Sequence, residues 1–362
     1  LVAGATLAGA EGIVSGTIEY GSYEYLHTEG SMNVPVSSQI ALRAAFATSS
    51  RDGYLSNGAD DEDTKSARLK LLYQPLEEFS FTLTGEHSLE NSHGFASVAM
   101  FANQDDAEPD PWYTDDDLGD PSNQKQDSLN SNITWDIGIA TLTAVPSYSK
   151  TTSNQVQSST QPGATEATVQ HMDFEQTEKA AEVRLVSADD FFFKWNIGAN
   201  YYDSENWRFT TTEGSKATEY QGYWNDSKAL YANLTYPVMD SFRVTAGARK
   251  NWAEMTTHSE QLNQSGGGMM GPGGPVQTGT SVTTTNSDGT TNTITDLVQE
   301  YPDTDLKFGV EYDLNESSML YADVSTSYRM QGQGMANSKG EYPPPEEMTA
   351  FSLGAKNRFF DN

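Results

Sequence analysis

Apolar and polar residues alternate along most of the chain with a period of two, which is typical of β-strands with one apolar face. Residues 227–236 give the clearest example. Their apolar face holds Leu230, Ala232, Leu234 and Tyr236. The same alternation returns in residues 67–73, 79–83, 242–249, 306–313 and 320–327. No helical period is sustained, so the pattern predicts an all-β chain with about thirteen antiparallel strands of roughly ten residues each.

The connections between these strands alternate in length. Short turns are predicted near residues 75–78, 138–140, 189–190, 237–240 and 315–317. Long polar loops are predicted near residues 51–64, 90–126, 151–174, 204–225, 255–302 and 331–346. This order is typical of an up-and-down transmembrane β-barrel with one plain end and one elaborated end. The Greek-key connections of a soluble sandwich would not preserve it. Pro146 falls inside a predicted strand, where its missing N–H group predicts a β-bulge.

Aromatic residues favour the barrel over the sandwich. The apolar faces carry an aromatic residue beside several short turns, as a barrel does at the lipid–water boundary. These residues are Tyr73, Phe79, Tyr236, Phe242 and Tyr312. The opposite faces carry charged residues, which suit the polar interior of a wide barrel. Those charges are Arg68, Lys70, Arg243, Arg249, Glu311, Asp313 and Arg329. In the alternative, a sandwich, the aromatics would be core residues and the charges would lie on a solvated outer face.

Composition excludes several classes of function. The chain has 362 residues with 21 Lys and Arg against 51 Asp and Glu, which gives a formal charge of −30. Such a charge repels nucleic acid, so no nucleic-acid partner is expected. The absence of Cys excludes a disulfide scaffold, a thiolate zinc site and a Cys nucleophile. The most apolar stretch, residues 1–10, is about half as long as a transmembrane helix, so a membrane would have to be crossed by strands.

Motifs for catalysis are weak. Residues 147–150 match S-x-x-K without any companion motif, and residues 332–334 begin a Gly-x-Gly pattern that does not continue. The five His residues are scattered, with no pair at helical zinc-ligand spacing. The sequence therefore predicts no enzyme, no catalytic residue and no cofactor.

The candidate ligand-binding residues are aromatic side chains predicted on the long loops. They are Trp112, Tyr113, Trp207, Tyr220, Tyr223 and Trp224. Such side chains can stack against a flat or ring-bearing ligand, or pack the loops against one another, and both interpretations stay open. Arg329, predicted to face the lumen, would pair with an anionic ligand. Asp115, Asp117 and Asp120 are weak candidates for Ca²⁺ ligands, because the EF-hand pattern fails and a solvated acidic loop explains them better.

Several segments resemble the barrel of TonB-dependent outer-membrane receptors. Its start is matched by Tyr-Gly-Ser-Tyr at residues 20–23, Gly30, Asn-Val-Pro-Val at 33–36, Ala-Leu-Arg at 41–43 and Arg-Asp-Gly-Tyr at 51–54. Intermediate and later strands are matched by residues 182–185, 246–249, 319–329, 344–346 and 353–362. The resemblance runs from about residue 15 to the end, and its strength lies in the order of these motifs.

The resemblance implies a barrel of 22 strands closed by an N-terminal plug, in the bacterial outer membrane. It implies uptake of a scarce nutrient, with an iron–siderophore complex as the leading candidate, driven by the TonB complex. The partners would be outer-membrane lipid, the nutrient and, through an N-terminal region missing here, TonB. Residues 1–14 would be a remnant of the plug-to-barrel junction, and residues 15–362 an incomplete barrel. We therefore expect an open, C-shaped wall with two free edges. The alternatives are a secreted acidic β-protein that binds glycans or surfaces, and a plain diffusion porin.

Overall fold

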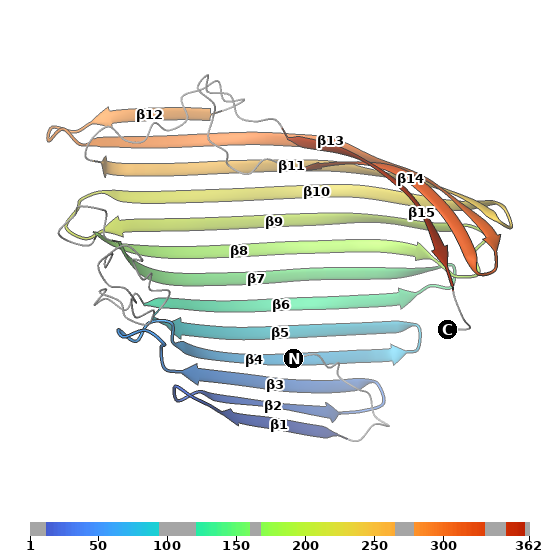
Figure 1. The fold of residues 1–362 in the computed structure, drawn as a ribbon, viewed down its shortest axis with the longest axis horizontal. Coiled ribbons are helices and arrows are strands. Elements are labelled where there is room, and N and C mark those ends of the chain that lie inside the picture. Colours follow the sequence, from blue (N-terminus) through green and yellow to red (C-terminus); the bar gives the residue numbers. More distant parts are fainter. Residues whose placement is uncertain (1–11, 94–120, 160–167, 265–278, 330–344, 359–362) are drawn as a thin grey trace, which may run out of the picture.

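The computed structural model describes residues 12–93, 121–159, 168–264, 279–329 and 345–358, which form one antiparallel sheet of fifteen strands (Figure 1). The first eight are β1 (Ile13–Tyr20), β2 (Leu26–Pro35), β3 (Ile40–Arg51), β4 (Glu62–Leu76), β5 (Phe79–Ser92), β6 (Ser122–Asp136), β7 (Ala140–Ser159) and β8 (Thr168–Ser187). The others are β9 (Lys194–Thr212), β10 (Thr218–Met239), β11 (Phe242–Gln264), β12 (Gly279–Thr285), β13 (Thr291–Asn315), β14 (Ser318–Arg329) and β15 (Glu346–Asn357). Among these residues there is no helix long and apolar enough to cross a membrane.

The topology is up-and-down, as predicted. Each strand pairs with its neighbour in the sequence, except that β13 follows β11 and the short β12 pairs with β13 alone. The connections at residues 36–39, 77–78, 137–139, 188–193, 240–241 and 316–317 lie together on the right of Figure 1. We call this the short-turn end and the opposite end the loop end.

The strands are more numerous and longer than the alternation predicts. The described residues hold fifteen strands rather than about thirteen, and the loop predicted at residues 204–225 shrinks to residues 213–217. The β10 strand has 22 residues, twice the nine to eleven that about 25 Å of hydrocarbon requires. The half of β10 toward the loop end carries polar groups on both faces. This half therefore lacks the apolar alternation by which a strand is recognised in the sequence.

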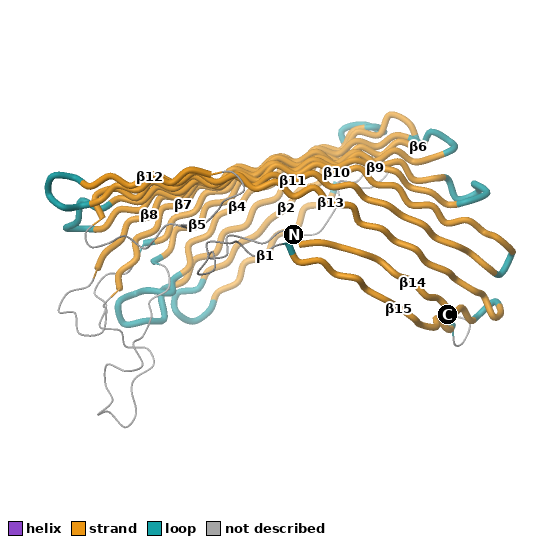
Figure 2. The backbone as a smooth tube through the Cα atoms, turned by 90° about the horizontal axis from the view of Figure 1, so that it is seen from above, coloured by secondary structure: helices purple, strands orange, loops and turns teal. Residues whose placement is uncertain are grey.

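The two faces of the sheet differ in chemistry and curvature. Figure 2 shows both lateral ends of the sheet bending toward the same side. On the polar face, side chains reach past the adjacent strand. Tyr231 of β10 bonds Glu182 of β8 and Arg249 of β11 bonds Asn200 of β9. Such convergence requires a concave surface, so the polar face is concave and the apolar face is convex.

The turn-side aromatics lie on the convex face, as predicted. Tyr73, Tyr236 and Tyr312 are 38–47% exposed there, and Phe242 pairs directly with Tyr312. Within the described residues there is one sheet and not two packed sheets, so the sandwich interpretation is wrong. The wall is also open: β1 pairs with β2 and β15 with β14, and these two edge strands do not pair with each other.

The β-bulge predicted at Pro146 is wrong. Pro146 pairs with Ala181 of β8 in an uninterrupted register. On the β6 side, pairing skips the residues between Asn130 and Ile133 and resumes in the same register. The proline without an N–H group is thus accommodated by a local gap in one ladder, without an inserted residue.

Candidate functional site: the polar concave face

Arginine residues define the concave face. Cross-strand register and alternation place eight of the nine arginines of the sequence on it. They are Arg43, Arg51, Arg68, Arg184, Arg208, Arg243, Arg249 and Arg329. On this concave wall, Arg243 and Arg249 reach partners on other strands.

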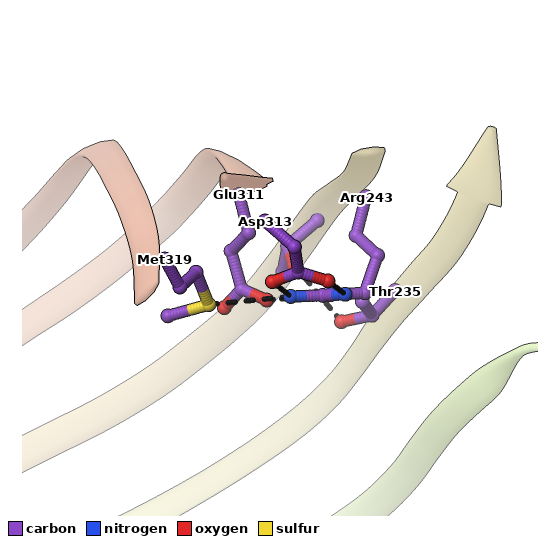
Figure 3. A network of polar contacts seen from close by, with 6 residues as sticks. Thr235, Arg243, Glu311, Asp313 and Met319 are labelled. Carbon is purple, nitrogen blue, oxygen red and sulfur yellow. Dashed lines mark hydrogen bonds and ion pairs between the residues drawn. The ribbon is translucent and has the colours of Figure 1, made fainter. Parts of the chain in front are cut away.

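At the short-turn end, Arg243 joins three strands (Figure 3). Its Nε donates to Glu311 Oε2 at 2.9 Å, while Nη1 and Nη2 donate to the two carboxylate oxygens of Asp313 at 2.5 and 2.8 Å. Nη2 also lies 3.2 Å from Met319 Sδ of β14. This bidentate arrangement fixes the relative positions of β11, β13 and β14, so its role is structural.

In the middle of the wall, tyrosine rings lie over glycines. The Tyr231 hydroxyl donates to Glu182 Oε1 at 2.5 Å, and its ring crosses Gly198. A Cβ atom at Gly198 would lie 2.4 Å from the Tyr231 hydroxyl, so any larger residue there would displace the Tyr231 ring. Tyr321 crosses Gly354 in the same way. These contacts stiffen the part of the wall that lies at membrane depth.

A second arginine network lies beside these tyrosines. Arg249 donates to Asn251 Oδ1 at 2.7 Å and to Asn200 Oδ1 at 3.1 Å. Asn251 in turn donates to Asp305 Oδ2 at 2.9 Å. The network links β9, β11 and β13 and lines the lumen with both signs of charge.

Toward the loop end, five polar side chains of β9, β10 and β11 form what we call the loop-end cluster. They are Arg208, Glu219, Gln221, Tyr223 and Gln261. Gln221 Oε1 accepts from Arg208 Nη2 at 2.7 Å and from the Tyr223 hydroxyl at 2.8 Å. Glu219 Oε1 accepts from the side-chain amides of Gln221 and Gln261.

The loop-end cluster lies beyond the membrane and retains unused donor capacity. Tyr223 is thirteen residues from Tyr236, or about 30 Å along the normal at the usual strand tilt. Burial raises the pKa of the Tyr223 phenol, and Arg208 opposes this shift. Arg208 Nε is buried without a partner among the described residues, and its guanidinium is 3.9 Å from Glu219. The side chain is 43% exposed, so an oxygen-rich anion can pair with the exposed part of the guanidinium.

The structure separates the predicted aromatic site residues. Trp207, Tyr220, Tyr223 and Trp224 lie in strands, so their placement on loops is wrong. Only Tyr223 lies on the concave face. Trp207 pairs with Gly222 on the convex face and contacts Tyr220 and Trp224 there, with ring centroids 5.0 and 4.4 Å apart. Their proposed role in ligand binding stays a prediction.

The other predicted residues are placed as follows. Arg329 lies at the loop end of β14 in the concave register, largely exposed, with Nη1 3.8 Å from Glu346. Trp112, Tyr113, Asp115, Asp117 and Asp120 lie outside the described residues. Sequence reasoning missed Arg208 and Gln221, although the spacing of 219, 221 and 223 would have placed three polar groups on one strand face.

A single antiparallel wall with an apolar convex face and a charged concave face defines a large outer-membrane barrel. The family model described as "TonB dependent receptor-like, beta-barrel" matches residues 54–362, so the chain belongs to this family. It is a protein of the bacterial outer membrane, and its family is one of receptors and transporters rather than enzymes. No curated protein sequence matches the chain.

Solved structures agree with this fold. The ferric-catecholate import receptor Fiu from E. coli K12, in its open form, superposes with a TM-score of 0.72 at 14% identity, over 98% of this chain and 58% of Fiu. The ferric yersiniabactin uptake receptor FyuA from Yersinia pestis gives 0.68 at 12% identity, over 97% and 52%. The copper transporter OprC gives 0.65 at 11% identity, over 97% and 53%. The chain thus spans about half the length of these proteins.

Proposed function

We propose that the chain forms part of the wall of a receptor that imports a scarce nutrient across the outer membrane with energy from TonB. An anionic iron–siderophore complex is the proposed cargo. Membership of the receptor family supports the proposal, together with siderophore receptors among the structural neighbours. The observation that carries the choice of cargo is the loop-end cluster, where the Arg208 side chain is 43% exposed and offers a cation on the lumen side.

The cluster suits a chelate because carboxylate, catecholate and hydroxamate oxygens accept hydrogen bonds. Arg208 would donate to a negatively charged oxygen, and the second N–H of the Gln261 side-chain amide would supply a neutral donor beside it. Nearer the short-turn end, the networks of Arg243 and Arg249 hold both positive and negative groups. A ligand released from the cluster would therefore meet no second site that binds anions strongly.

The test uses the full-length receptor that contains this chain, expressed in cells that lack their own siderophore receptors. Uptake of ferric catecholate, ferric hydroxamate and copper is measured with and without TonB. We expect ferric-chelate uptake that stops without TonB. Uptake that continues without TonB would indicate a diffusion porin, and uptake of copper alone would overturn the proposed cargo.

Two variants test the site itself. Arg208→Gln removes one charged hydrogen bond and should weaken ligand binding by about tenfold or more. Lys216→Gln is the matched control, because it removes a positive charge from the neighbouring turn without touching the cluster. Equal binding by Arg208→Gln and the control would refute the role of the cluster, and would leave the importer proposal to the uptake experiment.

A further inference from the structure

The convex face carries a cluster of aromatic rings near the loop end. Trp207 and Tyr220 stack with their ring centroids 5.0 Å apart, and Trp224 meets Trp207 edge-on at 4.4 Å. Both tryptophan rings cross Gly222, where a Cβ atom would lie 2.5 Å from one ring and 2.8 Å from the other. Phe209 pairs directly with Tyr220 and is 39% exposed. We call the four rings of residues 207, 209, 220 and 224 the outer-wall patch.

Contact with lipid does not explain the outer-wall patch. Trp224 and Tyr220 are twelve and sixteen residues from Tyr236, or about 30 and 40 Å along the membrane normal at the usual strand tilt. The apolar band of a barrel is only about 25 Å tall. The patch therefore faces water on the outer side of the membrane. A cluster of rings in water, unlike a single exposed ring, is typical of an interaction site.

Every ring of the patch has a carboxylate directly opposite it on a neighbouring strand. The register gives the four pairs Trp207–Glu175, Phe209–Asp173, Tyr220–Glu260 and Trp224–Glu205. An aromatic face attracts a cation through its quadrupole, and a carboxylate attracts it through its charge. The pairing of the two groups thus favours a positively charged partner.

A second set of carboxylates lies between the patch and the membrane. These residues stand directly opposite one another on β9, β10, β11 and β13, and we call them the acidic row. They are Asp203, Asp226, Glu254 and Glu300. Like charges in directly opposed positions destabilise a sheet. A partner that brings positive charge would remove this repulsion.

Lysines neutralise these eight carboxylates only in part. Three of the eight pair with a lysine at N–O distances of 2.8 to 3.2 Å, in the pairs Lys150–Glu175, Lys179–Asp203 and Lys228–Asp226. In the part of the chain that the structure describes, Glu205, Glu254 and Glu300 form no ion pair. The surface around the rings is therefore negative, which adds to the formal charge of −30 on the chain.

We propose that the outer-wall patch and the acidic row bind a basic, extended segment of another protein on the outer side of the membrane. Guanidinium groups of the segment would lie on the exposed parts of the rings and donate to the carboxylates beside them. The charge of the surface excludes an anionic partner. Its extent favours a segment over a single small cation, because the carboxylates spread from β8 to β13, or about 19 Å across the strands. The surface lies outside the lumen, so the inference does not depend on the proposed cargo.

The test measures peptide binding by the purified full-length receptor in detergent, with fluorescence anisotropy as the readout. The probe is a labelled peptide of six arginines separated by glycines. Peptides with lysine or glutamine in place of arginine are the comparison arms, and arginine amide is the competitor. Glu254→Gln with Glu300→Gln is the charge variant. Glu77→Gln with Glu78→Gln, two exposed carboxylates of a short turn, is its matched control. Trp224→Leu removes a ring and keeps an apolar side chain.

The arginine peptide should bind the charge variant about five-fold more weakly than the unchanged receptor or the control. It should also bind the unchanged receptor more tightly than the lysine peptide does, and Trp224→Leu should reduce this preference about three-fold. Equal binding by the charge variant and the control would overturn the proposal, as would equal binding of the arginine and glutamine peptides. Arginine amide that competes as strongly as the peptide would show a site for one cation, and would overturn it too. Resistance of the barrel to unfolding in detergent without heating checks that each variant is folded.

Discussion

Replacing Arg243 by Met tests whether the polar network at the short-turn end holds three strands together. The change keeps much of the length of the side chain but removes the donors that Glu311 and Asp313 share. The three side chains are 27%, 37% and 32% exposed, so their ion pairs lie between the surface and buried limits. Removing one partner from a buried pair costs about 3–5 kcal/mol, whereas an exposed pair contributes about 0–1. For this half-buried case we expect a loss of about 2–3 kcal/mol.

The assay is urea unfolding of the full-length receptor in lipid vesicles, followed by tryptophan fluorescence. Most of the loss should come from two carboxylates left without a cation. Adding Glu311→Gln and Asp313→Asn to Arg243→Met should therefore restore about half of it. Lys307→Met, on the same face of β13, is the control. If Arg243→Met unfolds like the control, or if neutralising the carboxylates restores nothing, the reasoning fails.

Two further changes test the middle and the loop end of the wall. Gly198→Ala should cost about 1–3 kcal/mol of unfolding free energy, because the new Cβ displaces the Tyr231 hydroxyl. Gly85→Ala, whose Cβ would meet only Leu129 at 3.9 Å, should be neutral, and equal losses would contradict the argument. Hydrogen bonds to Asp296 and then Glu260 raise the pKa of His258, so its stabilising contribution is complete below about pH 6.5 and is lost as pH rises through the raised pKa. Hydrogen exchange of β11 at the loop end should accelerate over that range, and His258→Gln should abolish this pH dependence.

The sequence predicts the membrane-spanning half of this wall well and the outer half poorly. Contact with lipid requires an apolar residue at every second position of a strand, and residues 227–236 show this alternation clearly. Beyond the membrane, toward the loop end, both faces of a strand meet water. Trp207, Gln221 and Trp224 then lie in strands whose pattern looks like a loop. Only the hydrogen-bonded register, in which Trp207 pairs with Gly222, shows that they belong to the sheet.

The same limit explains the outcome for the candidate site. Aromatic content alone selected Trp207, Tyr220, Tyr223 and Trp224, but the face on which each lies depends on parity along a strand. If residues 218–239 are treated as one strand, the odd-numbered residues Glu219, Gln221 and Tyr223 share one face. The contact between Arg208 and Gln221 joins two adjacent strands, so it depends on a register that no local pattern contains.

Curvature accounts for where the arginines of this wall lie: those of the described strands are all on the concave face, whereas lysines lie on both faces. On the concave face side chains converge, and a planar guanidinium can satisfy several acceptors at once, as Arg243 does with two carboxylates. On the convex face side chains diverge, so the several N–H groups of a guanidinium would find few fixed acceptors. A flexible point charge such as Lys228 needs no fixed set of acceptors there and pairs with a single carboxylate, that of Asp226. The placement of arginine therefore follows from the shape of the barrel, and in an up-and-down sheet of this kind it can indicate which face is the lumen.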